Sequence, residues 1–364
     1  MGTLTAFVKK YIPLWAFISR LVGIASGVIL LLAANLPRFA DGVNSTVSVA
    51  IRFILSSVTF LFPFSVFELL VLLALPLLCA LIVLSLRGKL TRVRCVRNIF
   101  SVTALLSIIF SSFVFTLGVG YRTTDVSDKM SLNNEGSISP EELLEVALLV
   151  REEINGLVDE IEFYGGESHS GYTVRKTSAL LCDAYDNLYE SYPVFTSFES
   201  RVKPVTFSGV MSDAGITGIY SFFTGEANVN TAYPDFSTTF TIAHEMAHQR
   251  GFARENEANF VAFLACIHSD DPYIRYSGYL YIYRYLMSDL YRASRELHAP
   301  VRDGLDNRAR EDVLAANAVA IAHSNKKLGE ISDKVNDSYL QMNGTEGIVT
   351  YGYVVRLAVV YYRK

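Results

Sequence analysis

The sequence predicts a protein in two parts, an α-helical membrane anchor followed by a mainly helical α+β domain. Hydrophobic residues make up 51% of the 364 residues and charged residues only 19%, a composition that usually combines membrane segments with a soluble part. The charges are also divided unevenly. Residues 1–121 hold ten of the 32 Lys and Arg residues but two of the 36 Asp and Glu residues, so 22 basic and 34 acidic residues remain for 122–364.

Three segments of residues 1–121 are long and apolar enough to cross a bilayer, which needs about 20 residues. They cover about 14–36, 64–86 and 99–121. The first could instead be a cleaved signal peptide, but its apolar run is interrupted by Arg20 and two more spans follow, which favours an uncleaved anchor. The loop 37–63 contains VSVAIRFILSSVTFLF, whose single charge is Arg52. It can form an amphipathic helix along the interface or a re-entrant segment.

The basic residues indicate how these spans are oriented. The loop 87–97 carries five basic residues and no acid, and the N-terminus carries Lys9 and Lys10. The positive-inside rule therefore places both in the cytoplasm, and residues 122–364 outside it. The net charge of −12 on this outer part argues against nucleic acid as a partner, because phosphate binding needs basic clusters.

A polar linker, 122–138, leads into the outer domain, 139–364. The domain is expected to begin with a helix, because SPEELLEVALLVREEINGLV has Ser139 as N-cap, Pro140 in the first turn and Glu142 to complete a capping box. A second helix is expected over about 173–191. From Tyr273 to about 336 the pattern is again helical, with an interruption near Pro300.

Strands are expected between these helices. β-Branched and aromatic residues predict them in VKPVTFSGV (202–210) and GITGIYSFF (215–223), and TGEA (224–227) predicts a turn. The short apolar end, GIVTYGYVVRLAVVYYRK, is assigned to the core of the domain. Two cysteines fall in the outer domain, Cys182 and Cys266; they could pair in an oxidising compartment, or remain two buried free thiols in apolar helices.

The stretch FTIAHEMAHQRGFARENEANF, residues 240–260, contains two histidines four residues apart. Asp235 or Ser237 is the expected cap of a helix here, and Gly251 its stop. His244 and His248 then project from one face, where two imidazoles can take two positions of a tetrahedral zinc at about 2.0–2.1 Å.

Glu245 follows the first of these histidines. It points about 100° away from His244, so it is badly placed as a ligand but can reach a water on the metal. That is the arrangement of H-E-x-x-H metallopeptidases, in which the glutamate is the general base. The alternative is two ordinary histidines on a solvated or core helix; the surrounding sequence favours the metal.

A third ligand is needed. Arg254 stands where the three-histidine class has its third histidine, which excludes that class. In ENEAN, Glu255 and Asn259 lie one turn apart, and here the sequence resembles the glutamate-zincins, whose second helix carries E-x-x-x-D. The resemblance implies that Glu255 completes the zinc shell and that Asn259, in place of Asp, accepts a hydrogen bond from a ligand histidine. Glu257 is the rival ligand.

A longer string, SGVMSDAGITGIYSFFTGEANVNTAYPDF followed by TIAHEMAHQRGFARENEANFVAFLAC, together with the three spans, resembles the bacterial domain of unknown function 3810 family. The resemblance covers essentially the whole chain, and 208–266 is its most specific part. It implies a zincin-like domain anchored in a bacterial cytoplasmic membrane, but it supplies no substrate.

Zincins also need an edge for the substrate and a group that stabilises the oxyanion. A strand before the motif helix forms one edge of the cleft, where an extended peptide can pair; GITGIYSFF or ANVN (227–230) could be this edge, or both could be plain hairpin structure. Tyr220, Tyr351 and Arg356 are the candidates for the oxyanion, although aromatic packing is an ordinary role for a tyrosine.

Two hypotheses remain for the function. The first is a membrane-anchored, zinc-dependent metallopeptidase that hydrolyses peptide bonds outside the cytoplasm, with the lipid bilayer and a peptide or protein substrate as its partners. The second is a non-catalytic binding or scaffold protein that keeps a structural metal site. Structural zinc sites are closed and often use thiolates. No cysteine lies close to the motif in sequence, and Glu245 stands next to His244. Both features favour catalysis.

Overall fold

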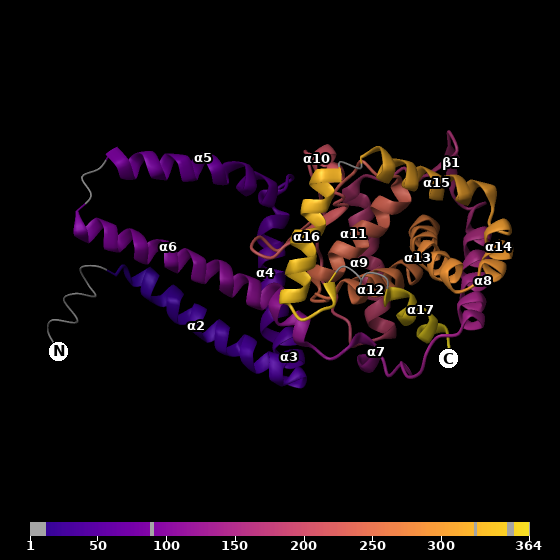
Figure 1. Ribbon diagram of the computed structural model, residues 1–364, viewed down its shortest axis with the longest axis horizontal. Coiled ribbons are helices and arrows are strands. Elements are labelled where there is room, and N and C mark those ends of the chain that lie inside the picture. The colour runs from indigo at the N-terminus through magenta and orange to yellow at the C-terminus, as the bar shows by residue number, and fades with distance from the viewer. Residues whose placement is uncertain (1–11, 88–90, 324–325, 348–352, 364) are drawn as a thin grey trace.

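The computed structural model consists of long helical rods that project from one end of a larger helical domain (Figure 1). It describes residues 12–87, 91–323, 326–347 and 353–363. Three helices within these residues are long and apolar enough to cross a membrane, namely Leu14–Asn35, Pro37–Phe60 and Val93–Gly118. The first and the last agree with two of the predicted spans, although the last begins before the expected Ile99.

The rods are α2 (Leu14–Asn35), α5 (Val66–Arg87) and α6 (Arg92–Phe113), which continues as η2 (Val114–Gly118). α2 and α6 pack closely along their length, and a Cβ at Gly23 would lie 2.9 Å from the Cβ of Ser107. α5 occupies the place of the predicted second span. Its described apolar stretch is Val66–Ala80, and the side chains at 69–80 are exposed, as expected of a helix that faces lipid.

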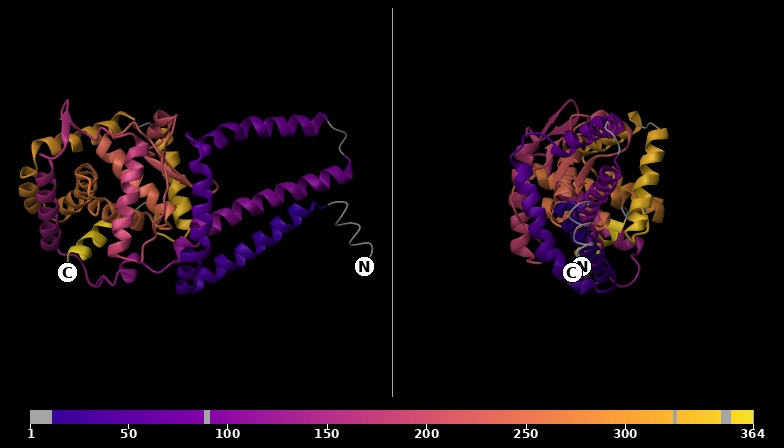
Figure 2. Two further views of the ribbon diagram at one scale, coloured as in Figure 1. Left: turned by 180° about the vertical axis from the view of Figure 1, so that it is seen from behind. Right: turned by 90° about the vertical axis from the view of Figure 1, so that its left-hand side faces the viewer.

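The region between the first two rods forms one nearly continuous helix, hereafter the crossing helix. It consists of α3 (Pro37–Val43), η1 (Asn44–Ser48) and α4 (Val49–Phe60). It runs across the ends of the rods, between them and the larger helical domain (Figures 1 and 2), which keeps the name outer domain for its place beyond the rods. Although this helix has the length and composition of a span, it cannot cross the same bilayer as rods that lie at a steep angle to it. Its polar residues Arg52, Ser56 and Thr59 are buried.

The outer domain is built mainly from helices. Its longer helices are α8 (Pro140–Leu157), α9 (Val174–Ser191), α11 (Asp235–Gln249), α12 (Glu255–Ile267), α13 (Pro272–Ala293), α14 (Arg295–Asp303), α15 (Asn307–Ala322), α16 (Lys326–Met342) and α17 (Val354–Tyr362). α12 is the central one: Phe260 to Cys266 are fully buried. α17 packs its apolar residues into the same core, as expected for the C-terminal segment; residues 348–352 of that segment lie outside the described residues.

A small sheet lies beside α11. Its strands are β3 (Lys203–Pro204), β4 (Gly218–Ser221) and β5 (Glu226–Val229), in the order β3-β5-β4. The prediction of a strand over 202–210 was wrong for all but Lys203 and Pro204: Val205 N still donates to Val229 O, but Ser208–Asp213 forms the helix α10. β5 is central, so ANVN cannot be an edge, whereas β4 is an outer strand.

A second, two-stranded sheet was not predicted. β1 (Glu162–Tyr164) and β2 (Glu167–His169) form an antiparallel hairpin. Gly165 and Gly166 at its tip have φ values of +61° and +95°. A Gly-Gly pair is a known hairpin signal.

Several helix boundaries test the predictions further. The capping box of Ser139 and Glu142 is present at the start of α8. Neither Asp235 nor Ser237 caps α11, because Pro234 occupies the N-cap position and the Asp235 carboxylate accepts from Ser170 N instead. The predicted interruption near Pro300 was also wrong: Pro300 lies inside α14, and the breaks fall before and after that helix. Cys182 and Cys266 are both free thiols.

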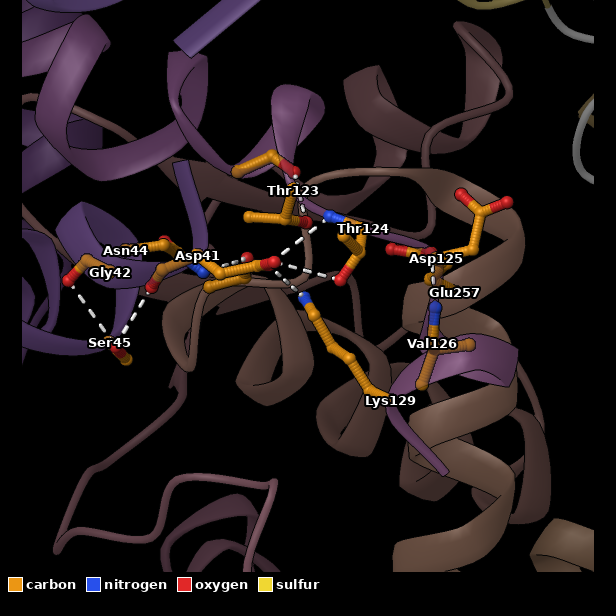
Figure 3. Close-up of polar contacts among 12 residues, drawn as sticks. Asp41, Gly42, Asn44, Ser45, Thr123, Thr124, Asp125, Val126, Lys129 and Glu257 are labelled. Atoms are coloured by element: carbon orange, nitrogen blue, oxygen red, sulfur yellow. Dashed lines mark hydrogen bonds and ion pairs between the residues drawn. The ribbon is translucent and has the colours of Figure 1, made fainter. Parts of the chain in front are cut away.

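The predicted linker is partly folded. It contains η3 (Gly120–Arg122) at its start and α7 (Val126–Lys129). Asp41 of α3 accepts hydrogen bonds from the backbone and hydroxyl of Thr124 and pairs with Lys129 at 3.1 Å, while Glu257 of α12 accepts from Val126 N at 2.9 Å (Figure 3). The linker therefore connects the crossing helix with the core of the outer domain.

A buried ion pair makes a second connection. Lys203 of β3 and Glu226 of β5 bond each other. Lys203 also donates to Thr59 O at the end of α4, and Glu226 accepts from Val66 N and Phe67 N at the start of α5. A carboxylate at a helix N-terminus satisfies free N–H groups and complements the helix dipole. The pair thus fixes the α4–α5 turn to the sheet.

Candidate metal centre

Two consecutive helices carry the candidate ligands. α11 ends at Gln249 and α12 begins at Glu255, and Gly251 between them has a φ of +103°. That conformation suits glycine, and it allows the chain to reverse within a few residues. Glu255 is the first residue of α12, so the reversal brings it back against the histidines of α11.

The ligand atoms of His244, His248 and Glu255 form a compact triangle, hereafter the ligand triangle. The two Nε2 atoms are 3.0 Å apart, and Glu255 Oε2 lies 3.2 Å from His244 Nε2 and 3.4 Å from His248 Nε2. Neighbouring ligands of a tetrahedral zinc with bonds of about 2.0–2.1 Å are separated by about 3.3–3.4 Å. The ligand triangle has nearly these dimensions, and its donor set suits zinc.

The ring orientation of His248 also suits a ligand. Its Nδ1 lies 2.7 Å from the carbonyl oxygen of Phe252. A proton on Nδ1 donates to that carbonyl and leaves the Nε2 lone pair directed into the ligand triangle.

His244 is oriented differently. Its Nδ1 is buried and has no partner, and neither has Nδ2 of the neighbouring Asn259. Asn259 is close enough to His244 to affect the pKa of that ring. If the amide is turned so that its oxygen faces His244, it can accept the Nδ1 proton.

The electrostatics of the ligand triangle reflect burial and mutual contact. Burial alone lowers the pKa of His248, but the Glu255 carboxylate outweighs it and raises that pKa to about 9. Burial opposes ionisation of Glu255 too, yet His248 and His244 hold its pKa well below the usual range. Burial lowers the pKa of His244. These directions describe the chain without a metal.

Glu245 lies beside the ligand triangle and is only 4% exposed. Its Oε2 has no hydrogen-bond partner, and burial raises its pKa to about 8. On its other side stands Gly218 of β4, where a Cβ would collide with Glu245 Oε1 and come within 2.7 Å of Thr241 Cγ2. The glycine therefore leaves the space that this carboxylate occupies.

The other candidates from the sequence lie elsewhere. Glu257 is 2% exposed and bonds Val126 N and Arg254, so it is engaged with the linker. Arg356 bonds the backbone and side chain of Asn134 and the carbonyl of Gly136. These contacts assign both residues to holding the linker in place.

Of the two tyrosine candidates, only Tyr220 lies within the described residues, and it is engaged in packing. Tyr220 is buried in a cluster with Leu117, Tyr121, Ala253 and Leu340. Its hydroxyl has no hydrogen-bond partner by distance and angle. Tyr351 lies outside the described residues.

Two tyrosines that the sequence did not suggest lie near the carboxylates. Burial raises the pKa of Tyr339, on α16, to about 12, and the Glu255 carboxylate adds to this rise. Tyr281, on α13, stacks on Phe240 with ring centroids 3.7 Å apart, and burial with Glu255 and Glu245 raises its pKa. Neither lies in a motif, so only the packing of helices distant in sequence reveals them.

The turn between the ligands touches the membrane anchor. Asn44 of η1 donates to Gly251 O at 3.2 Å, and Arg52 of α4 bonds Asn44. A Cβ at Gly251 would collide with the Arg52 guanidinium, and one at Gly120 would lie 2.9 Å from Gly251 O. The crossing helix thus packs directly against the reversal that brings Glu255 to the histidines.

Comparison with known proteins gives one match. The model of a family described as "Protein of unknown function (DUF3810)" matches residues 44–359, which is most of the chain. No curated protein and no solved structure matches.

Proposed function

Because the chain belongs to the DUF3810 family, whose function is unknown, its activity must be derived from its own site, and we propose that it is a membrane-anchored zinc metallopeptidase. The observation that carries this proposal is the ligand triangle. Two imidazole nitrogens and one carboxylate oxygen converge with separations of 3.0, 3.2 and 3.4 Å. Three protein ligands with one position left for water is the pattern of catalytic zinc sites.

In this proposal His244, His248 and Glu255 hold the zinc, and Asn259 orients His244 through its carbonyl. Zinc in such a set supplies Lewis-acid activation of water near neutral pH. Glu245 would take a proton from this water on its Oε2 atom, which is buried and has no hydrogen-bond partner. Its pKa of about 8 applies to the metal-free chain; a neighbouring cation lowers a carboxylate pKa, which makes Glu245 available as a base at neutral pH.

The surroundings of Glu245 support a peptide as substrate. β4 is an outer strand of its sheet, and its Gly218 faces Glu245. An extended peptide paired with β4 would pass beside the general base, with its backbone held by hydrogen bonds.

The burial of the site favours a second candidate function, a membrane-anchored scaffold with a structural metal. His248 is 7% exposed and Glu255 9%, and structural metal sites are closed. The two functions differ in the role of Glu245, which a scaffold would not require as a base.

Two measurements on the full-length chain in detergent test both functions. They are its zinc content and its hydrolysis of a protein substrate. We expect one zinc per chain in the wild type, and little in His248→Ala or Glu255→Gln. Glu257→Gln, a change at a buried glutamate on the same helix, is the matched control and should keep its zinc. If His248→Ala contained as much zinc as the wild type, the ligand triangle would not be the zinc site.

Glu245→Gln then separates the two functions. It should retain zinc and lose hydrolysis of an unstructured protein such as casein by ~10²–10⁴, the usual contribution of a general base. Zinc in the wild type and in Glu245→Gln, but not in His248→Ala, without hydrolysis by the wild type would favour the scaffold.

We also propose that residues 122–364 lie outside the cytoplasm. The charge asymmetry of the loop 87–97 supports this orientation. A reporter that is active only outside the cytoplasm should be active when fused after residue 125 and inactive when placed at Lys89. The same response at both positions would contradict the orientation.

A further inference from the structure

We propose that α16 lies on the membrane surface, with a row of exposed apolar side chains inserted at the boundary between lipid headgroups and acyl chains. The row consists of Ile331, Val335 and Met342, which are 59%, 65% and 83% exposed. At about 100° per residue these three positions fall within about 40° of one another around the helix. Single exposed apolar residues are common on proteins, but three aligned on one helix need a partner.

The rest of α16 is arranged as a surface helix requires. Leu340 and Asn343 are buried against the domain, and Leu340 lies roughly 140–180° from the apolar row. Exposed charged residues, including Asp333 and Lys334, occupy the remaining arc. The helix therefore has one face for the protein, one apolar face and one charged face, which is the pattern of a helix lying at a lipid interface.

The N-terminal end of α16 is tied to the base of α5. His323, just before α16, lies with its Nδ1 3.3 Å from Asp213 at the end of α10. Directly before α10, the N–H groups of Thr206 and Phe207 donate to the Glu68 carboxylate of α5. The start of α16 is thus at the level where α5 leaves the domain.

The C-terminal end of α16 is tied to the base of α6. The Tyr339 ring makes edge-on contacts with Phe113 of α6, at 6.3 Å between centroids, and with Tyr121 of η3, at 6.1 Å. Both ends of α16 therefore contact segments that adjoin rods, and the helix lies across the rod-bearing end of the domain, as Figures 1 and 2 show.

Other exposed apolar side chains lie at the same level. Phe207 and Val210 are 49% and 61% exposed beside α5, and Leu61, Phe62 and Phe64 are 78%, 41% and 49% exposed in the α4–α5 turn. We name this set and the α16 row together the membrane-facing rim: Leu61, Phe62, Phe64, Phe207, Val210, Ile331, Val335 and Met342.

The bilayer is the occupant that this position favours. The rim surrounds the base of helices whose length and composition suit a membrane, and the right-hand view of Figure 2 shows α16 beside the rods and not behind them. A bilayer that encloses the rods must end at this level. A second copy of the chain or another protein would have to occupy the space that lipid headgroups fill.

Tryptophan fluorescence in lipid discs tests the proposal on the full-length chain. Trp15 is the only tryptophan, so Trp15→Phe provides a silent background for Val335→Trp and, separately, Ile331→Trp. With acyl-chain-brominated phosphatidylcholine, we expect blue-shifted emission that is quenched about twofold or more, because a surface helix buries its apolar face about 5–10 Å into the boundary.

Two control positions make the result specific. Lys334→Trp places the probe about 60–100° from the three apolar positions around the same helix and should be quenched clearly less. Tyr164→Trp places it on β1, at the opposite end of the domain (Figure 1), where the residue is 64% exposed, and should not be quenched. The proposal would be overturned if Val335→Trp and Ile331→Trp were quenched no more than Tyr164→Trp. Blue-shifted emission without quenching by brominated lipid would also overturn it, since a protein surface would then cover the row.

Discussion

Two buried polar clusters of the outer domain differ in how completely the protein satisfies them. The Lys203–Glu226 pair has side-chain exposures of 1% on both sides, and each charged atom has a partner, including three backbone groups of the α4–α5 region. The ligand triangle is less deeply buried, with side-chain exposures of 9–13%. Its ligand atoms, however, face one another, and buried atoms around it have no partner: Nδ1 of His244, Oε2 of Glu245 and Nδ2 of Asn259.

Under the proposed function, this difference separates a structural cluster from a functional one. Buried polar groups in folded proteins are nearly always hydrogen-bonded, and exceptions need an explanation. The Lys203–Glu226 pair needs nothing from outside the chain. The ligand triangle instead brings three electron-pair donors to one place, and in the function proposed above a metal cation accepts them.

Breaking the Lys203–Glu226 pair should give the largest loss of stability. Lys203→Met leaves the Glu226 carboxylate buried without its cation, which costs about 3–5 kcal/mol. In the metal-free chain at pH 8, Glu255→Gln should cost much less, because the remaining histidines can become neutral. Thermal unfolding in detergent measures both. Equal losses would show that the two clusters do not differ in the way described.

Zinc should stabilise the chain through one cluster only. At a free zinc concentration 100 times Kd, the free energy of unfolding should rise by about 2.7 kcal/mol. The rise should persist in Lys203→Met and disappear in His248→Ala. A zinc-dependent rise in His248→Ala of the wild-type size would indicate that the metal binds elsewhere.

Asn259→Ala should have a smaller effect on the same site. Loss of a group that orients a ligand histidine usually weakens metal binding about 10–100-fold. Competition with a zinc chelator gives the affinity. Asn343→Ala, which changes a buried asparagine just after α16, is the control and should leave the affinity unchanged; if Asn259→Ala does so too, Asn259 does not orient His244.

The stability of the metal-free chain should also drift with pH. The pKa of His248 is raised to about 9 and that of Glu245 to about 8. A raised pKa means that the folded state holds its proton more tightly, so the stability gained from both groups is present at low pH and is lost as pH rises. Thermal unfolding with a chelator should therefore show stability falling from about pH 7 to 9.

Zinc should reverse the sign of that drift, because the bound form needs His248 without its proton. Stability in zinc should rise or stay level over the same range. A metal-free chain that becomes more stable from pH 7 to 9 would contradict the electrostatics described for the ligand triangle.

Local signals in the sequence predicted a large part of the fold. The capping box at Ser139 and the apolar lengths of the rods depend on neighbouring residues, and both features are present in the structure. The spacing of His244, His248 and Glu255 also predicted that they meet, because helical phase and one tight turn at Gly251 suffice. Some failures were local too: α10 forms within a predicted strand, and Pro234, next to Asp235, takes the N-cap position.

The surroundings of the candidate site could not be predicted from the sequence. The Phe252 carbonyl that orients His248, the nearby Tyr339, and Gly218 beside Glu245 come from a turn, α16 and β4. No local pattern marks such contacts, since they depend on how whole elements pack. The position of the crossing helix belongs to the same class: its composition allows a span, and only its packing on the outer domain shows another course.

The crossing helix also determines where the chain can be cut. A truncated chain beginning at residue 122 would resemble a convenient soluble fragment, but it would lose Asn44 and Arg52 behind Gly251, and Thr59, Val66 and Phe67 around the Lys203–Glu226 pair. The buried charges of that pair would then meet solvent on an opened apolar face. The hydrophobicity profile therefore marks a boundary in composition and not in folding: the membrane half is part of the scaffold on which the candidate site is built.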